Sequence, residues 1–152
     1  MMQTSTNAPA DNKQVMQLSS SQDSIMLVEK ILQDLCAPYY VNEDIYGNML
    51  VALTEAVTNA IQHGNKFADA KKVILTCAGA NDGLQFTITD QGNGFDPNVV
   101  PDPTAPENIE KPNGRGVFLM KHLADGVSYN DEGRTVVLDF KLHHANTEAV
   151  AE

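Results

Sequence analysis

Apolar residues recur at three- and four-residue spacing in two long segments of the first half of the chain, which predicts two amphipathic helices. The first runs from about residue 22 to residue 37, with Ser20, Ser21 or Asp23 as its N-cap and Pro38 at its end. Its apolar stripe consists of Ile25, Val28, Ile31, Leu32 and Leu35.

The second helix is predicted to follow Val41–Asp44 and to run to His63, where Gly64 suits a left-handed cap. Its second half carries a stripe of Leu53, Ala56, Val57, Ala60 and Ile61. Gly47 lies inside this helix at a cost of about 1 kcal/mol relative to alanine. We therefore expect tertiary packing to favour glycine at that position.

Alternation with a period of two, together with β-branched residues, predicts strands elsewhere in the chain. Leu84, Phe86 and Ile88 alternate with polar residues, so their strand has one buried face. The predicted strands are 15–19 (an edge strand), 72–78, 84–89, 127–129 and 135–142, with turns at 81–83 and 130–133.

A third helix is predicted over residues 115–125, ended by Gly126. Val117, Met120, Leu123 and either Phe118 or Leu119 form its buried side. The order of elements is strand, two helices, two strands, a long loop, one helix and two strands. It predicts an α+β fold, a two-layer sandwich with helices on one face of a mixed, mostly antiparallel sheet.

Three segments lack any apolar period. Residues 1–13 and 143–152 are polar and are predicted to be disordered tails that flank one domain over 14–142. Residues 95–113 hold five of the seven prolines, and a loop of this length is usually a functional lid or else disordered. With the glycines that follow, the predicted lid covers 95–116.

Composition narrows the classes of protein. A chain of 152 residues suits one domain, and its net charge of −10 argues against nucleic acid as a partner. No apolar run reaches the roughly 20 residues of a membrane span, and no secretory signal is expected. Cys36 and Cys77 are predicted to be buried, reduced thiols, which is typical of a cytoplasmic protein.

Glu55, Asn59 and His63 are each four residues apart and are predicted to share one helix face. A glutamate one turn from an asparagine suits the chemistry of metal-bound phosphates. The amide oxygen can complete a Mg²⁺ shell, and the carboxylate can orient a hydroxyl or water for attack. On this pattern alone, a solvated polar helix face is the alternative.

Two glycine-containing blocks follow. Asp90 comes at the end of a strand, where a buried acceptor would select an amino purine, while Gly92 and Gly94 let the backbone approach a base. The alternative is an ordinary turn. Gly114 and Gly116 lie where the lid becomes a helix, which suits a phosphate site.

Arg115 lies between these two glycines. Its guanidinium either has a functional role, reaching a phosphate or shielding the lid, or belongs to an ordinary surface arginine, and the sequence leaves both interpretations open.

Leu53–Asn65, Asp90–Phe95 and Asn113–Val117, in this order and spacing, resemble the N, G1 and G2 boxes of the GHKL ATPase superfamily. That superfamily includes gyrase, a heat-shock chaperone, histidine kinases and MutL. The first block looks most like the anti-sigma-factor serine/threonine kinases. The resemblance covers roughly residues 15–142. Arg115 inside the Gly-x-Gly and the proline-rich lid depart from the common pattern.

The resemblance implies a histidine-kinase-like ATPase fold that uses ATP and Mg²⁺. It implies that Glu55 is the catalytic base, that Asn59 is the Mg²⁺ ligand, and that Asp90 accepts a hydrogen bond from adenine. It also places Thr135 near the adenine. His63 has three interpretations: a phosphate contact, a side chain that braces the first box, or a helix-end histidine favoured by the dipole.

By resemblance, the protein phosphorylates a serine or threonine of a small antagonist protein, and a sigma factor is a second candidate partner. Partners among nucleic acids and membranes are not expected, and a homodimer remains open. A histidine kinase would need a dimerisation helix pair, and a gyrase- or MutL-like ATPase a coupled second domain. We expect neither. The alternative that stays open is a non-catalytic, ATP-gated binding module.

Overall fold

The computed structural model describes residues 13–80, 82–94 and 112–142. The predicted tails, the predicted lid up to residue 111 and Asn81 of the predicted turn lie outside the described residues. Within the described part, no helix is both long enough and apolar enough to cross a membrane.

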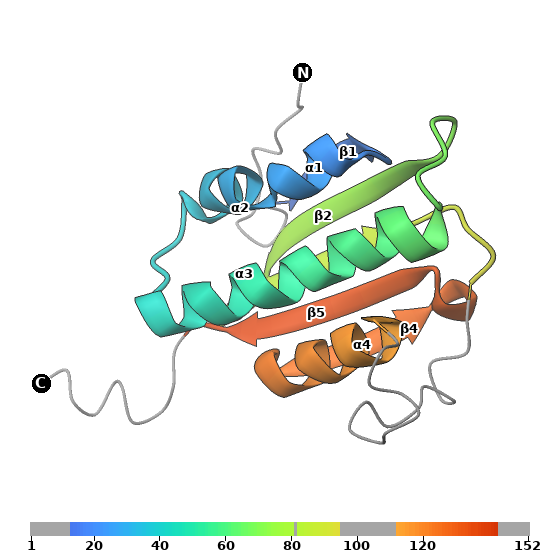
Figure 1. Cartoon of the computed structure of the whole chain (residues 1–152). Coiled ribbons are helices and arrows are strands. Elements are labelled where there is room, and N and C mark those ends of the chain that lie inside the picture. The colour runs from blue at the N-terminus through green and yellow to red at the C-terminus, as the bar shows by residue number, and fades with distance from the viewer. Residues whose placement is uncertain (1–12, 81, 95–111, 143–152) are drawn as a thin grey trace, which may run out of the picture.

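Five strands of the described chain form one sheet in the order β1-β2-β3-β5-β4, and every pairing is antiparallel. The helices lie together on one face of this sheet (Figure 1). The predicted α+β sandwich is therefore confirmed. The strands are β1 (Lys13–Ser19), β2 (Lys72–Ala80), β3 (Gly83–Thr89), β4 (Gly126–Asn130) and β5 (Thr135–Lys141).

The core lies between the sheet and the long helix α3 (Glu43–Thr58), which crosses the middle of the sheet (Figure 1). Phe86 and Phe140, on adjacent strands, pack edge to face with ring centroids 6.1 Å apart. The helix contributes Met49, Ala52, Leu53, Ala56 and Val57, each at most 2% exposed. The predicted stripe of α3 is the buried one because apolar area gains most by leaving water.

The first predicted helix is two helices, α1 (Gln22–Met26) and α2 (Val28–Cys36). Ser21 caps α1 as expected, and its Oγ accepts from the Ser24 N–H at 3.4 Å. Leu27 separates the two with φ −92° and ψ 0°, outside the helical region. The apolar stripe continues on both sides of Leu27, so the pattern of residues did not reveal the break.

The prediction for the end of the main helix was wrong. Regular α-helix stops at Thr58, and Asn59–Gly64 form a π-helix. The Asn65 N–H donates to the Ala60 carbonyl, five residues back, at 2.8 Å. Gly64 is not left-handed; Lys66 and Phe67 adopt positive φ angles of 54° and 58° instead.

Gly47 also differs from expectation. It is exposed, and a Cβ placed there would meet nothing within 4 Å. Packing of the described residues therefore does not explain this glycine.

Helix α4 covers Pro112–Leu123 and begins three residues earlier than predicted. Proline suits a first helical turn because the N–H that it lacks would have no intrahelical acceptor. Val117 and Met120 are buried as expected, whereas Phe118 and Leu119 are 48% and 37% exposed. Phe118 stacks on His122 instead of entering the core. Gly126 begins β4 and does not end the helix.

Candidate functional site

A cavity of about 260 Å³ lies beside the π-helix, the end of β3, α4 and the turn between β4 and β5. Four of the predicted site residues line it: Asn59, His63, Asp90 and Gly94. The other lining residues are Ala56, Ala60, Gly64, Lys66, Ile88, Asn93, Val117, Met120, Tyr129, Gly133, Arg134 and Val136. Mostly apolar walls with a few polar groups are typical of a small-molecule site.

Glu55 and Asn59 lie together beneath the first turns of α4. A Cβ on Gly116 would be 2.8 Å from the Asn59 Nδ2 atom and 3.0 Å from the Glu55 Oε1 atom. Glycine therefore allows α4 to lie directly on this pair. Glu55 is half-buried and does not line the cavity, and its burial raises the pKa of its carboxyl group.

Asn59 is the first residue of the π-helix, and its N–H donates to the carbonyls of both Glu55 and Ala56. The sequence spacing predicts that His63 lies one regular turn beyond Asn59. It does not, because a π-turn is wider than an α-turn. Short π-helical insertions are frequent at functional sites.

The His63 imidazole faces the cavity with a buried Nε2 atom that has no hydrogen-bond partner among the described residues. Burial, and then the positive charge of Lys66, lower the pKa of His63 below the ordinary 6.5. The neutral form of the imidazole is therefore favoured over what an exposed histidine would show.

Asp90 directly follows β3. Its backbone N–H donates to the Arg134 carbonyl at 2.9 Å, and its Oδ1 atom accepts from the Gly92 N–H at 2.8 Å. No other hydrogen bond joins this carboxylate to the described residues. Burial raises the pKa of Asp90, and this effect is opposed by the Gly92 hydrogen bond and the charge of Arg134.

Two glycines allow the backbone to approach this carboxylate. A Cβ on Gly64 would lie 2.5 Å from the Asp90 Cγ atom, and a Cβ on Gly92 would overlap the Gly64 carbonyl. Gly94 has a φ of 84°, and a Cβ there would overlap the Glu132 carbonyl. The glycines thus bring the π-helix, the loop after β3 and the β4–β5 turn into contact.

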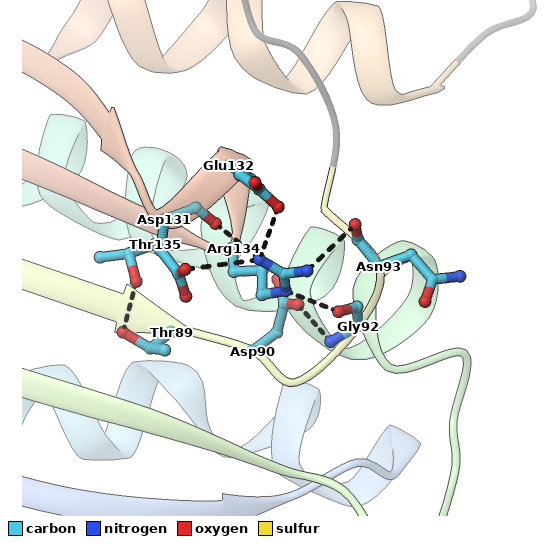
Figure 2. A network of polar contacts seen from close by, with 8 residues as sticks. All are labelled: Thr89, Asp90, Gly92, Asn93, Asp131, Glu132, Arg134 and Thr135. Atoms are coloured by element: carbon cyan, nitrogen blue, oxygen red, sulfur yellow. Dashed lines mark hydrogen bonds and ion pairs between the residues drawn. The ribbon is translucent and has the colours of Figure 1, made fainter.

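The remaining predicted residues lie around the cavity. The Thr135 and Thr89 hydroxyls pair at 3.0 Å, and Thr135 does not line the cavity (Figure 2). Gly114 and Arg115 belong to the first turns of α4. The side chain of Arg115 lies outside the described part of the structure.

Sequence reasoning missed Asn65, which is 1% exposed. Its Nδ2 atom donates to the Ser20 Oγ at 2.9 Å and to the Lys72 carbonyl at 3.1 Å, and its Oδ1 atom accepts from the Gln91 N–H at 2.7 Å. One amide therefore connects the π-helix to three separate segments. Asn65 follows the His-Gly pair directly, but a sequence does not show that an asparagine is buried.

Sequence reasoning also assigned no role to Arg134, which lines the cavity. Figure 2 shows its guanidinium between the loop after β3 and the β4–β5 turn. Its position directly after Gly133, in a chain with two arginines, is the signal that could have singled it out.

The described residues contain no group of three or more His, Cys, Asp or Glu side chains that could hold a metal ion. A Mg²⁺ ion that is carried by phosphates needs fewer protein ligands, because water and phosphate oxygens fill most of its shell. The amide of Asn59 at the cavity wall fits that requirement.

Comparisons with known proteins agree with this arrangement. Residues 18–140 match the family of the histidine kinase-like ATPase domain. The serine-protein kinase RsbW of Bacillus cereus (strain AH187) is 33% identical over 108 residues, which cover 66% of this chain and 67% of that protein. The protein of the same name from Bacillus anthracis (strain CDC 684 / NRRL 3495) is 32% identical over the same length.

Among solved structures, the RsbU and RsbW domains of a Mycobacterium tuberculosis protein share the fold, with a TM-score of 0.62 at 15% identity. The match covers 86% of this chain and 32% of the solved chain, so this protein spans about a third of it.

The chain belongs to the histidine kinase-like ATPase domain family. Within that family it is a relative of the RsbW serine-protein kinases. The predicted resemblance to the GHKL superfamily and to its anti-sigma-factor kinases is thereby confirmed.

Proposed function

We propose that this protein binds Mg²⁺-ATP and transfers the γ-phosphoryl group to a serine or threonine of a small antagonist protein. The observation that carries the proposal is the pairing of Glu55 and Asn59 beneath Gly116, beside a cavity whose other end presents Asp90. The same proposal includes a sigma factor as a second partner and a cytoplasmic location. It includes no nucleic-acid or membrane partner. A homodimer remains open.

The cavity suits adenine in shape and in chemistry. Ala60, Ile88 and Met120 provide apolar walls for a flat ring. The Oδ1 atom of Asp90 is engaged by Gly92, which leaves Oδ2 to accept from the exocyclic amine. A site built around such an acceptor rejects the oxo group of guanine. The contact between Thr135 and adenine stays part of the proposal.

The residues packed against α4 indicate where the phosphates of the nucleotide would bind. Asn59 would hold Mg²⁺ through its amide oxygen, and the bound ion neutralises charge on the phosphate oxygens. His63, which lines the cavity, would contact the phosphates. The Gly114 N–H in the first turn of α4, with Arg115, forms the proposed anion site, and the part of the predicted lid that precedes α4 would cover it.

Glu55 would orient the attacking hydroxyl and accept its proton. Its burial raises the pKa of the carboxyl group toward the working pH, which is what a general base requires. Loss of a positioned base typically costs about 10²- to 10⁴-fold in rate.

One observation favours a second function. Glu55 does not line the cavity, so a non-catalytic module that binds partners according to its nucleotide state is the alternative.

The test compares Glu55→Gln and Asn59→Ala, with Glu29→Gln on exposed α2 as a matched control. Asn59→Ala should weaken Mg²⁺-ATP binding and phosphate transfer together. Glu55→Gln should leave ATP affinity nearly unchanged and slow transfer about 10²- to 10⁴-fold. Calorimetry gives the affinity, and phosphate transfer to a candidate serine-bearing antagonist gives the rate.

Transfer by Glu55→Gln at the wild-type rate would exclude Glu55 as the base. Wild-type protein that binds ATP but neither transfers nor hydrolyses it would establish the binding module instead.

A further inference from the structure

Arg134 makes more polar contacts than a surface arginine needs. It directly follows the Asp131–Gly133 turn, and its side chain is 26% exposed. All three guanidinium nitrogens donate to oxygen atoms of the protein (Figure 2). Arg134 lines the cavity, but these contacts occupy most of its five N–H donors. The geometry therefore favours a structural role at the cavity over phosphate binding.

On one side, Arg134 holds the loop after β3. Its Nε atom donates to the Gly92 carbonyl at 2.8 Å, and an Nη atom donates to the Asn93 carbonyl at 3.4 Å. The carbonyl of Arg134 itself accepts from the Asp90 N–H at 2.9 Å. Backbone and side chain together contact three residues of the segment that carries the proposed adenine acceptor.

On the other side, Arg134 stabilises an unusual turn. Asp131 and Glu132 have φ angles of 54° and 57°, a conformation that residues with a Cβ rarely adopt. The other Nη atom donates to the Asp131 carbonyl at 3.1 Å and pairs with the Glu132 carboxylate at 3.3 Å. A planar fork of donors can serve both sides at once, and a lysine ammonium cannot.

We propose that Arg134 is a positioning residue of the nucleotide site, which ties the Asp90–Asn93 segment to the Asp131–Gly133 turn and sets Asp90 at the cavity before nucleotide binds. The inference rests on the proposed nucleotide binding, and it adds Arg134 as a residue on which that binding depends. Arg134 touches the loop through carbonyl groups, so it acts on a ligand through Asp90.

The charge of Arg134 supports the same role. Burial raises the pKa of Asp90, and the nearby guanidinium acts in the opposite direction, toward the ionised acceptor. Removing Arg134 should therefore shift the loss of ATP affinity on acidification to a higher pH. A lysine, which keeps a positive charge, should restore part of this pH profile but not the fixed position of the loop.

The experiment uses the full chain with Arg134→Ala and Arg134→Lys, and with Lys30→Ala as control. Lys30 makes an exposed ion pair with Asp34 at 3.3 Å on α2. Its replacement changes the net charge by the same amount as Arg134→Ala does, at a position away from the site. Amide exchange in nucleotide-free protein reports on the loop, and calorimetry with ATP and GTP between pH 5 and pH 8 reports on the site.

In both Arg134 variants, the amide hydrogens of Asp90 and Gly92 should exchange about 10- to 100-fold faster than in the wild type. Amides inside β3 and β5 should keep their protection. ATP affinity should fall by a similar factor in Arg134→Ala, and the preference for ATP over GTP should shrink. Lys30→Ala should change neither measurement.

Unchanged loop exchange in both variants would overturn the inference, as would wild-type ATP affinity and base preference despite faster exchange. Wild-type exchange and ATP affinity in Arg134→Lys would show that the positive charge alone is sufficient. That result would also overturn the inference. Wild-type protein that binds no nucleotide would overturn the proposed function itself. Where Arg134→Ala does not fold, Arg134→Lys decides the exchange result.

Discussion

Gly64 and Gly92 lie where two stretches of backbone meet at the Asp90 carboxylate. Gly47 lies in open space on the exposed side of α3. All three are glycines, yet the fold requires glycine at two of them and makes no visible use of it at the third.

Alanine substitutions should separate these cases. Gly64→Ala and Gly92→Ala should each destabilise the protein by about 1 to 3 kcal/mol, since a Cβ would be forced into packed atoms. Gly47→Ala should stabilise it by about 0.5 to 1 kcal/mol, because alanine loses less conformational entropy in a helix. Urea unfolding at pH 7 measures all three. Equal effects at the three positions would contradict the close approach of backbone at Asp90.

His63 gives the site a pH dependence with a defined sign. Its pKa is lowered in the folded state, so the unfolded chain takes up the proton first as the pH falls. The stability that neutral His63 contributes is present above the ordinary pKa of 6.5 and is lost as the pH falls through the lowered folded value. Asp90, Lys66 and Arg134 are the charged residues that line the cavity with it.

The free energy of unfolding of the wild type should therefore fall more between pH 7.5 and pH 5.5 than that of His63→Gln. The difference between the two proteins isolates the contribution of His63 from those of Glu55 and Asp90, whose pKa values are raised. His122→Gln, on the exposed side of α4, serves as control. Parallel pH profiles for wild type and His63→Gln would show that His63 titrates normally.

At the scale of elements, the π-helix decides how the predicted residues meet. It separates His63 from the regular line of Glu55 and Asn59. It ends at Gly64, and the side chain of the next residue, Asn65, joins Ser20, Lys72 and Gln91. A buried amide with partners for its donors and its acceptor specifies one arrangement of the surrounding segments.

Asn65→Asp tests that arrangement with an almost isosteric change. The carboxylate keeps an acceptor for the Gln91 N–H but loses both donated hydrogen bonds and adds a buried charge. We expect a loss of about 2 to 4 kcal/mol in the free energy of unfolding, measured by urea denaturation. Asn48→Asp, exposed on α3, is the matched control. A loss below about 0.5 kcal/mol would mean that the segments are held without Asn65.

At the scale of the whole molecule, a ligand of the cavity stabilises every element that surrounds it. The cavity walls come from α3, the π-helix, α4, β3, β4 and β5, so a nucleotide there contacts elements of both the helical layer and the sheet. Binding to the folded state alone raises stability by mass action.

Mg²⁺-ATP at a hundred times its Kd should add about 2.7 kcal/mol to the free energy of unfolding. GTP at the same concentration should add less, because Asp90 would face an oxo group. Asp90→Ala should remove most of the difference between the two nucleotides. Thermal unfolding with each nucleotide measures the effect, and equal shifts with ATP and GTP would remove the adenine role of Asp90.

The sequence by itself determined the fold class, the order of elements and the family. Alternation in β3, the helical stripe of α3 and the turn residues are local properties, and short-range pattern reports them directly. The order and spacing of the three motif blocks, through their resemblance to the boxes of the GHKL superfamily, identified Glu55, Asn59 and Asp90 as candidates.

Only the tertiary structure decided which residues meet. Asn65 bonds to Ser20 across 45 positions, and Arg134 bonds to Gly92 across 42. The π-helix also escaped prediction, because its residues carry the same stripe as the α-helix before it. Local pattern reports what each segment favours alone, whereas contacts between distant segments depend on how closely their backbones pack, and here glycine at 64, 92 and 116 sets that distance.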